Sequence, residues 1–146
     1  MDIRRATAED ATAIAEMEAE YFSDPWSRKD ILSYICSSDG MCFSAVKDGE
    51  TVAYVIGRII PPEGEIYRVA VKESERCRGI GYRLLSYALK TERGRGLETT
   101  FLEVRSKNVA ARRLYTAHGF KEMGIRKNYY KNPDDDAVIM LLGRPV

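Results

Sequence analysis

The stretch "RCRGIGYRLL", from Arg76 to Leu85, places two glycines two residues apart where a helix is about to begin. Glycine inside a helix costs about 0.5–1 kcal/mol relative to alanine, so a bare backbone at this point needs a reason. The preceding "YRVAV" is rich in β-branched and aromatic residues, which favours a strand. A bare turn between a strand and a helix N-terminus offers free N–H groups to a phosphate. The stretch therefore predicts a strand, an anion-binding turn and a helix that runs to about Arg93.

Two familiar phosphate-binding sequences are excluded for this turn. No Gly-Lys followed by Ser or Thr is present, and Leu84 occupies the place of the third glycine in the pattern GxGxxG. Taken alone, the two glycines are as compatible with an ordinary strand-to-helix turn as with a phosphate site. The neighbouring motifs decide between these interpretations.

Strand and helix patterns alternate on both sides of the turn. Asp48-Gly49 between two apolar runs predicts a hairpin, and Pro25 separates two helices because proline cannot continue a helix. Asn108 and Gly119 are suited to begin and end the last helix. The expected strands are 2–7, 41–47, 50–60, 65–71, 98–104, 120–130 and 135–142, the other helices are 7–22 and 28–36, and 61–65 is expected to be a loop.

This order of elements predicts a mixed α/β layer fold, in which strands connected through a helix run parallel. With 146 residues, the chain fits one domain, residues 1–146, with a sizeable core. Apolar residues make up 45% and charged residues 31% of the chain, which is typical of a globular protein and not of a disordered one.

Charge and cysteine content narrow the class of function. Lysine and arginine number 23 against 22 acidic residues, a net charge of +1, which argues against a general nucleic-acid binder. The three cysteines form no CxxC pair and no Cys/His spacing that suits zinc, so we expect reduced thiols and no metal. No apolar run approaches the 18 residues of a membrane span, and no signal sequence is evident. We therefore expect a cytoplasmic protein without a membrane partner.

The motifs around the glycine turn carry a family resemblance. "YRVAV", "RCRGIGYRLL", "FLEVRSKNVAARRLYTAHGF" and "RKNYY" follow one another in the order and spacing of the GNAT superfamily of acyl-CoA N-acyltransferases. The chain most closely resembles the bacterial ribosomal-protein-alanine N-acetyltransferase branch, from "DPWS" to "DDAVIM". The resemblance implies the GNAT fold, with a mixed central sheet of about six to seven strands flanked by about four helices.

The resemblance also implies a site for acetyl-CoA as co-substrate. In such proteins the strand matching Val69–Val71 holds the pantetheine, and the loop matching Cys77–Tyr82 holds the pyrophosphate through its amides. Arg76 and Arg78 add positive charge near the phosphates, although either arginine alone is equally well explained as a solvated cation. The cofactor-binding set expected from the resemblance is Val69, Ala70, Val71, Arg76, Cys77, Arg78, Gly79, Ile80, Gly81, Tyr82 and Asn108.

Glu103 is an acidic residue in the otherwise apolar strand "FLEVR". An ionised carboxylate there needs a partner or a role. From the residues alone, a cross-strand salt bridge to Arg105 or Arg58 is the simpler interpretation. The resemblance implies that Glu103 is the general base, which takes the proton of the amine directly or through water.

Tyr115 lies on the last helix, where an aromatic side chain most often packs in the core. The resemblance implies that it is the general acid for the leaving CoA thiolate. Cys77 is not expected to be a nucleophile, since it lies in the phosphate loop. His118 is expected to be structural, because a cation at a helix C-terminus suits the macrodipole.

The resemblance implies that the acceptor is the N-terminus of a ribosomal protein, with alanine first. A terminal α-amine has a pKa of about 7.7–8.0 and a lysine side chain about 10.4, so one modest base serves the terminus more easily. Alternatives are a GNAT enzyme acting on a lysine side chain or a small-molecule amine, and a non-catalytic acyl-CoA-binding module. The expected acceptor-binding residues are Phe22, Trp26, Tyr129 and Tyr130, although for Trp26 closure of the core is an equal explanation.

Overall fold

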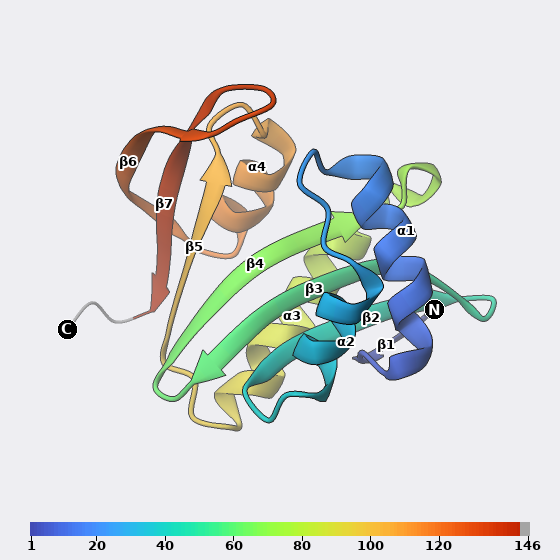
Figure 1. Ribbon diagram of the computed structural model, residues 1–146. Helices are drawn as coiled ribbons and strands as arrows, with labels where there is room; N and C mark the ends of the chain where they lie inside the picture. The colour runs from blue at the N-terminus through green and yellow to red at the C-terminus, as the bar shows by residue number, and fades with distance from the viewer. Residues whose placement is uncertain (144–146) are drawn as a thin grey trace.

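The computed structural model describes residues 1–143, which fold into one seven-stranded sheet flanked by four α-helices (Figure 1). The strand order is β1-β2-β3-β4-β5-β7-β6. The strands are β1 (Asp2–Arg5), β2 (Gly40–Lys47), β3 (Glu50–Ile60), β4 (Glu63–Val71), β5 (Thr99–Arg105), β6 (Lys121–Tyr130) and β7 (Asp135–Gly143). The helices are α1 (Ala11–Tyr21), α2 (Arg28–Cys36), α3 (Ile80–Arg93) and α4 (Val109–Ala117), with short 3₁₀ turns η1 (Ala8–Asp10) and η2 (Glu73–Glu75). The mixed α/β architecture expected from the sequence is confirmed.

Two tight turns set the register of the first half of the sheet. Lys47 pairs with Glu50 across Asp48 and Gly49, whose φ values of 52° and 77° suit the expected hairpin. The loop expected at 61–65 is wrong. Only residues 61 and 62 form the turn, because residues 63–65 find ladder partners on β3 and, at the same time, on β5.

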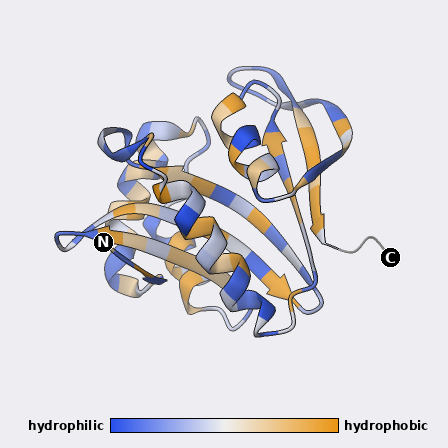
Figure 2. Cartoon of the chain, turned by 180° about the vertical axis from the view of Figure 1, so that it is seen from behind, coloured by the Kyte–Doolittle hydropathy of each residue, from blue (hydrophilic) through white to orange (hydrophobic). Residues whose placement is uncertain are grey.

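The helices cover both faces of the sheet. In Figure 1, α1 and α2 lie in front of the central strands and α3 lies behind them. Two apolar cores result: one of α1, α2 and the facing side chains of β2–β4, the other of α3, α4 and the opposite sheet face. Figure 2 shows the central strands largely hydrophobic and the tips of the β2–β3 and β6–β7 hairpins hydrophilic. Because successive side chains of a strand point to opposite faces of the sheet, the strands contribute alternate residues to the two cores.

The sheet divides between β4 and β5. These two strands run parallel, as expected for strands joined through α3, but pair only from Glu63–Ile66 to Thr99–Leu102 within the described chain. Beyond this point β4 stays with β3, and β5 stays with β7. Figure 1 shows the two halves of the sheet diverging from there.

A bulge in β4 lies next to this division. The register between β3 and β4 shifts between Ile56 and Gly57, which leaves one extra residue on β4. As a result Tyr67 and Arg68 both contact side chains on the α1/α2 face: Tyr67 meets Trp26, and Arg68 lies over Phe22. The bulge therefore turns a large aromatic and a cation toward the same side of the opening.

Candidate active site

The open edge of β4 supplies backbone groups to the gap between the strands. Val69, Ala70 and Val71 pair with Val55, Tyr54 and Ala53 on one side. On the other side no strand of residues 1–143 is paired with them. An unpaired strand edge presents N–H and C=O groups that need a partner. The expected pantetheine-binding segment is therefore an accessible strand edge.

The glycine turn leads directly from this edge into α3. Gly79 caps the helix in the left-handed region with φ 77°, and Cys77, exposed, has φ 63°. Within residues 1–143, no amide N–H from 77 to 82 donates a hydrogen bond. A side chain at Gly81 would come within 3.4 Å of Val71 Cγ2 and 3.6 Å of Leu114 Cδ2. These are ordinary contact distances to side chains that pack on the core, so the feature of the turn that fits a diphosphate is its free N–H donors.

The two arginines of the turn differ in their contacts. Arg76 donates from Nε to the carbonyl oxygen of Val71 at 2.9 Å, and its guanidinium lies 4.5 Å from the centre of the Tyr21 ring. Arg78 is exposed and lies 3.4 Å from Glu75. Arg76 therefore fixes the turn against β4, whereas Arg78 is an exposed charge near it that pairs with Glu75.

The start of α4 lies on the far side of the turn. Asn108 caps this helix, since its Oδ1 accepts from the Ala111 N–H at 3.1 Å, as expected. His118, at the other end of α4, contacts Ser86 Oγ at 2.9 Å and stacks on Tyr82 with 4.2 Å between ring centres. His118 therefore joins α4 to α3, and its structural role stays a prediction that these contacts fit.

Glu103 lies on β5 just beyond the last paired step with β4. Its side chain is 19% exposed, and its Oε2 is buried without a hydrogen bond in residues 1–143. The nearest cation is Arg126 on β6, with Nε 3.7 Å from that oxygen. The salt-bridge partners expected from the sequence, Arg105 and Arg58, are therefore wrong. β7 lies between β5 and β6, and residues 103, 126 and 137 share one face, so Arg126 reaches across β7 to Glu103.

Tyr115 and Tyr130 differ in burial, since Tyr115 is buried and Tyr130 is half-buried near Glu103. Burial, and then the charge of Glu103, raise the pKa of Tyr130 to about 12. Burial, with a further contribution from Tyr130, raises the pKa of Tyr115, which packs on Phe120 with 5.6 Å between ring centres. Both hydroxyls therefore keep their protons at neutral pH. Tyr115 packs in the core and also lies near Tyr130, so a packing role does not exclude a catalytic one.

One wall of the opening is the loop between α1 and α2. Trp26 is half-buried and stacks on Tyr34 with 4.9 Å between ring centres, so it does close the core of α1 and α2. Phe22 lies under the guanidinium of Arg68, 4.1 Å from it. The carboxylate of Glu18, fully buried, accepts from the Trp26 N–H at 3.0 Å and lies 3.5 Å from Arg68. Phe22 and Trp26 are thus held around one cation.

The opposite wall is the β6–β7 hairpin. Tyr129 is exposed and packs edge-on against Tyr130 with 5.0 Å between ring centres. Arg105 donates to the carbonyl oxygens of Pro133 and Lys131 at 2.7 and 2.9 Å, and lies 4.5 Å from the Tyr130 ring centre. Arg105 also reaches Ser23 Oγ of the first wall at 3.4 Å. The structure therefore brings the four expected acceptor-binding aromatics to the two sides of one opening.

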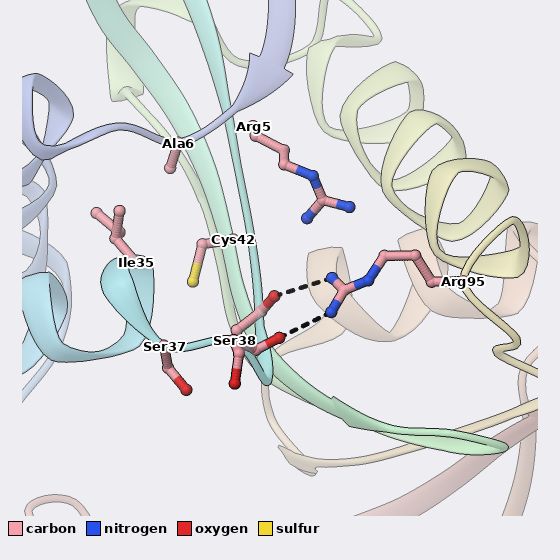
Figure 3. Close-up of a pocket in the computed structure, with 8 residues that line it drawn as sticks. Arg5, Ala6, Ile35, Ser37, Ser38, Cys42 and Arg95 are labelled. Carbon is pink, nitrogen blue, oxygen red and sulfur yellow. Dashed lines mark hydrogen bonds between the residues drawn. The ribbon is translucent and has the colours of Figure 1, made fainter.

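A separate cavity of about 320 Å³ lies at the other end of α3 (Figure 3). Its two arginines, Arg5 and Arg95, both pair with the buried Glu92, and Arg95 also donates to the carbonyl of Ser38 at 2.8 Å. Burial raises the pKa of the neighbouring Cys42 thiol to about 11, which keeps it unreactive at neutral pH. The polar groups of this cavity are thus already occupied with one another. In the described chain no cluster of His, Cys, Asp and Glu is arranged to hold a metal ion.

Several charged residues around the opening were missed from the sequence. Glu18 follows Ile14 by four residues and so lies on the buried face of α1, a signal that was available. The roles of the others depend on the β4 bulge or on the order of the strands, which the sequence does not reveal. The missed residues are Glu18, Glu65, Arg68, Arg105 and Arg126.

Comparison with known proteins agrees with this geometry. Residues 11–120 match the acetyltransferase (GNAT) family, and the chain belongs to that family. It is an acetyl-CoA-dependent N-acetyltransferase by class.

The relatives give a finer likeness. The chain is 33% identical over 138 residues to the Escherichia coli "[Ribosomal protein bS18]-alanine N-acetyltransferase", covering 91% of this chain and 90% of that one. It is 36% identical over 140 residues to "N-alpha-acetyltransferase RimI" of Mycobacterium tuberculosis, with 92% and 87% covered. A crystal structure of the Escherichia coli ribosomal-protein-S18-alanine N-acetyltransferase superposes with a TM-score of 0.88 at 31% identity, covering 99% of this chain and 94% of that one.

None of the helices in residues 1–143 combines the length and the apolar character that crossing a membrane demands.

Proposed function

We propose that this protein transfers the acetyl group of acetyl-CoA to the α-amine of a ribosomal protein, with alanine as the first residue of the acceptor. The observation that carries the proposal is the buried, hydrogen-bond-free oxygen of Glu103 beside the point where β4 and β5 separate. A carboxylate that lacks a donor in the folded chain is suited to receive one from a substrate. The names of the relatives support the ribosomal acceptor.

The co-substrate fits the residues that line the opening. When bound, acetyl-CoA supplies the acetyl thioester. The free amides of 77–82 and the α3 N-terminus suit its diphosphate, with Arg76 and Arg78 as nearby cations. The open edge of Val69, Ala70 and Val71 suits the pantetheine, and its N–H groups are placed to stabilise negative charge on the thioester oxygen. Asn108 and the bordering Ile80 and Tyr82 complete this set.

The proton inventory assigns two roles. Glu103 takes one proton from the acceptor ammonium, so that the nitrogen lone pair becomes free to form the amide bond. Tyr115, whose hydroxyl stays protonated because burial raises its pKa, holds a proton for the departing sulfur. As the C–N bond forms and the C–S bond breaks, Tyr115 gives its proton to the sulfur, and the nitrogen loses its second proton, which restores the Tyr115 hydroxyl through water. The proton on Glu103 then passes to water, so each turnover releases one proton. Transfer is direct, without an acetylated Cys77.

The acceptor chain enters between the two aromatic walls. Phe22 and Trp26 border one side, and Tyr129 and Tyr130 border the other. A terminal α-amine costs about 1 kcal/mol to deprotonate at pH 7, whereas a lysine costs about 4.6 kcal/mol at 1.36 kcal/mol per pKa unit. With a single carboxylate as base, the α-amine is therefore the favoured class of nucleophile. A ribosomal acceptor also places the reaction in the cytoplasm.

The test compares acceptors directly. Purified protein and acetyl-CoA are incubated with peptides that begin with alanine, with the same peptides blocked at the α-amine but carrying a free lysine, and with small amines. We expect CoA release and a mass gain of one acetyl group only with the free α-amine. Mass spectrometry of ribosomal-protein N-termini from cells with and without the gene then identifies the acceptor. Turnover on lysine or small amines alone, or binding of acetyl-CoA without turnover on any amine, contradicts the proposal.

A further inference from the structure

A second carboxylate lies beside Glu103. Glu65 is opposite Phe101 in the β4–β5 ladder, and Glu103 is two residues farther along β5, so both glutamates belong to one face of the sheet. The intervening Ile66 and Leu102 are buried on the α3 side, which places the glutamates on the α1/α2 side. Two acidic side chains therefore sit at the apex of the opening, where the strands stop pairing.

The charged groups around Glu65 leave it without a close partner. Burial first, and then the charge of Glu103, raise the pKa of Glu65, while Arg126 and Arg58 act in the opposite sense. Arg126 lies against Glu103, at 3.7 Å, and Arg58 lies against Asp39, also at 3.7 Å.

No ion pair of 4.0 Å or less in residues 1–143 includes Glu65. The adjacent tyrosine on β4, Tyr67, has its own pKa raised by burial first and then by the charge of Glu65. The four groups that face Glu65 are therefore Glu103 from β5, Arg126 from β6, Arg58 from β3 and Tyr67 from β4.

We propose that Glu65 and Glu103 together form an anionic seat for the α-ammonium of the acceptor, with Glu65 as a binding residue. This inference rests on the proposed function. Two carboxylates at close range repel each other, and a cation placed between them removes that cost. An ammonium has three N–H donors, which suits the unoccupied oxygen of Glu103 and a second carboxylate.

The seat affects both the acceptor before transfer and the release of the product. One proton passes from the ammonium to Glu103, while Glu65 continues to hold the acceptor. Acetylation then replaces a cation with a neutral amide. The product therefore loses its attraction to the seat and leaves.

The test uses Glu65→Gln with Glu63→Gln as the matched control. Glu63 is exposed on the same strand and the same face, two residues farther from the opening, so both variants lose one negative charge from β4. In the presence of CoA, calorimetry measures the affinity for an alanine-initiated peptide and for its analogue in which a propionyl group replaces the alanine, which lacks the ammonium. We expect Glu65→Gln to reduce the preference for the ammonium by about tenfold, as for a charge pair that is partly shielded from water.

If wild-type protein turns over the peptide but all three proteins share one ammonium preference, the role of Glu65 is refuted while the proposed function stands. If wild-type protein turns over no peptide, both are overturned.

Discussion

Replacing Glu103 with glutamine separates its chemistry from its part in folding. The buried Oε2 makes no hydrogen bond, so the amide of glutamine breaks none at that atom. The substitution loses one contact, 3.7 Å from an Arg126 side chain that is 56% exposed. Such a pair is worth about 0–1 kcal/mol, and the loss of repulsion with Glu65 offsets it. We therefore expect the free energy of unfolding of Glu103→Gln to stay within about 1 kcal/mol of wild type.

The effect on catalysis is larger and depends on pH. A positioned general base contributes about 10²- to 10⁴-fold. An α-amine with a pKa of about 7.7–8.0 is only about one-tenth neutral at pH 7 and almost fully neutral at pH 9. Without its base, the protein has to capture the neutral amine from solution. We expect kcat/KM to fall about 100- to 1,000-fold at pH 7, and the deficit to shrink by about tenfold at pH 9.

The assay follows CoA release with an alanine-initiated peptide from pH 6 to pH 9, for wild type and Glu103→Gln. Calorimetry with CoA serves as the binding control, and its Kd is expected to be unchanged. A deficit that is the same at every pH points to a positioning effect and contradicts the assignment of Glu103 as base. An unchanged rate removes Glu103 from the mechanism altogether.

Three further substitutions test other parts of the structure. Tyr115→Phe keeps the buried ring and removes the proton donor, so we expect steady-state kinetics to show a kcat about tenfold lower and an unchanged KM for acetyl-CoA. An unaltered kcat contradicts the role of Tyr115 as the acid. Gly79 and Gly49 both have φ 77°, so replacing either with alanine introduces the same strain, which we expect to lower the free energy of unfolding in urea by about 1–2 kcal/mol. Only Gly79→Ala is expected to weaken CoA binding in calorimetry. Equal effects of the two variants on binding contradict the phosphate-site assignment. Burial disfavours the charged form of Asp10, but hydrogen bonds from Arg4 and two other donors hold the pKa of its carboxyl below 3.8. The ionised carboxylate therefore stabilises the fold fully above that pH, and this stabilisation is lost as the pH falls below it. Asp10→Asn is expected to lower the free energy of unfolding by about 2–4 kcal/mol at pH 7 and by much less at pH 2, and a pH-independent loss refutes the linkage.

Local sequence patterns were sufficient for the elements and for several of their ends, but not for the start of β4. The Asp48-Gly49 turn is local, because both residues must accept a positive φ that few others tolerate. The caps at Ser27 and Asn108 are also local, since each side chain accepts from an N–H three residues on. Interactions of this kind involve only neighbours in the chain, so they can be predicted from the sequence alone.

The partners of the site residues could not be predicted from local sequence patterns. The strand "TFLEV" has the same alternation before and after Leu102, so nothing in it shows where pairing with β4 ends. The partner of Glu103 is Arg126, because β7, the last strand in the chain, is inserted between β5 and β6. That order is a property of the whole sheet. The resemblance supplied the roles of Glu103 and Tyr115, but the surroundings that give these roles a physical basis required the structure.

The proposed acceptor walls are held by buried charge as well as by their aromatic residues. Glu18 is fully buried, and its partners are the hydroxyl of Tyr54, the Trp26 N–H and Arg68. Breaking such a pair leaves an uncompensated charge in the core, which costs about 3–5 kcal/mol. The loop that carries Phe22 and Trp26 is therefore fixed from beneath by α1 and β4.

The opposite wall is held from β5 by Arg105, whose guanidinium donates to two hairpin carbonyls and also reaches Ser23 in the first wall. The two walls are thus anchored to strands that separate at Leu102, and Arg105 links them across the opening. The 3.4 Å contact between Arg105 and Ser23 is longer than the contacts of Arg105 with the two hairpin carbonyls. The link between the walls is therefore weaker than the attachment of the hairpin to β5.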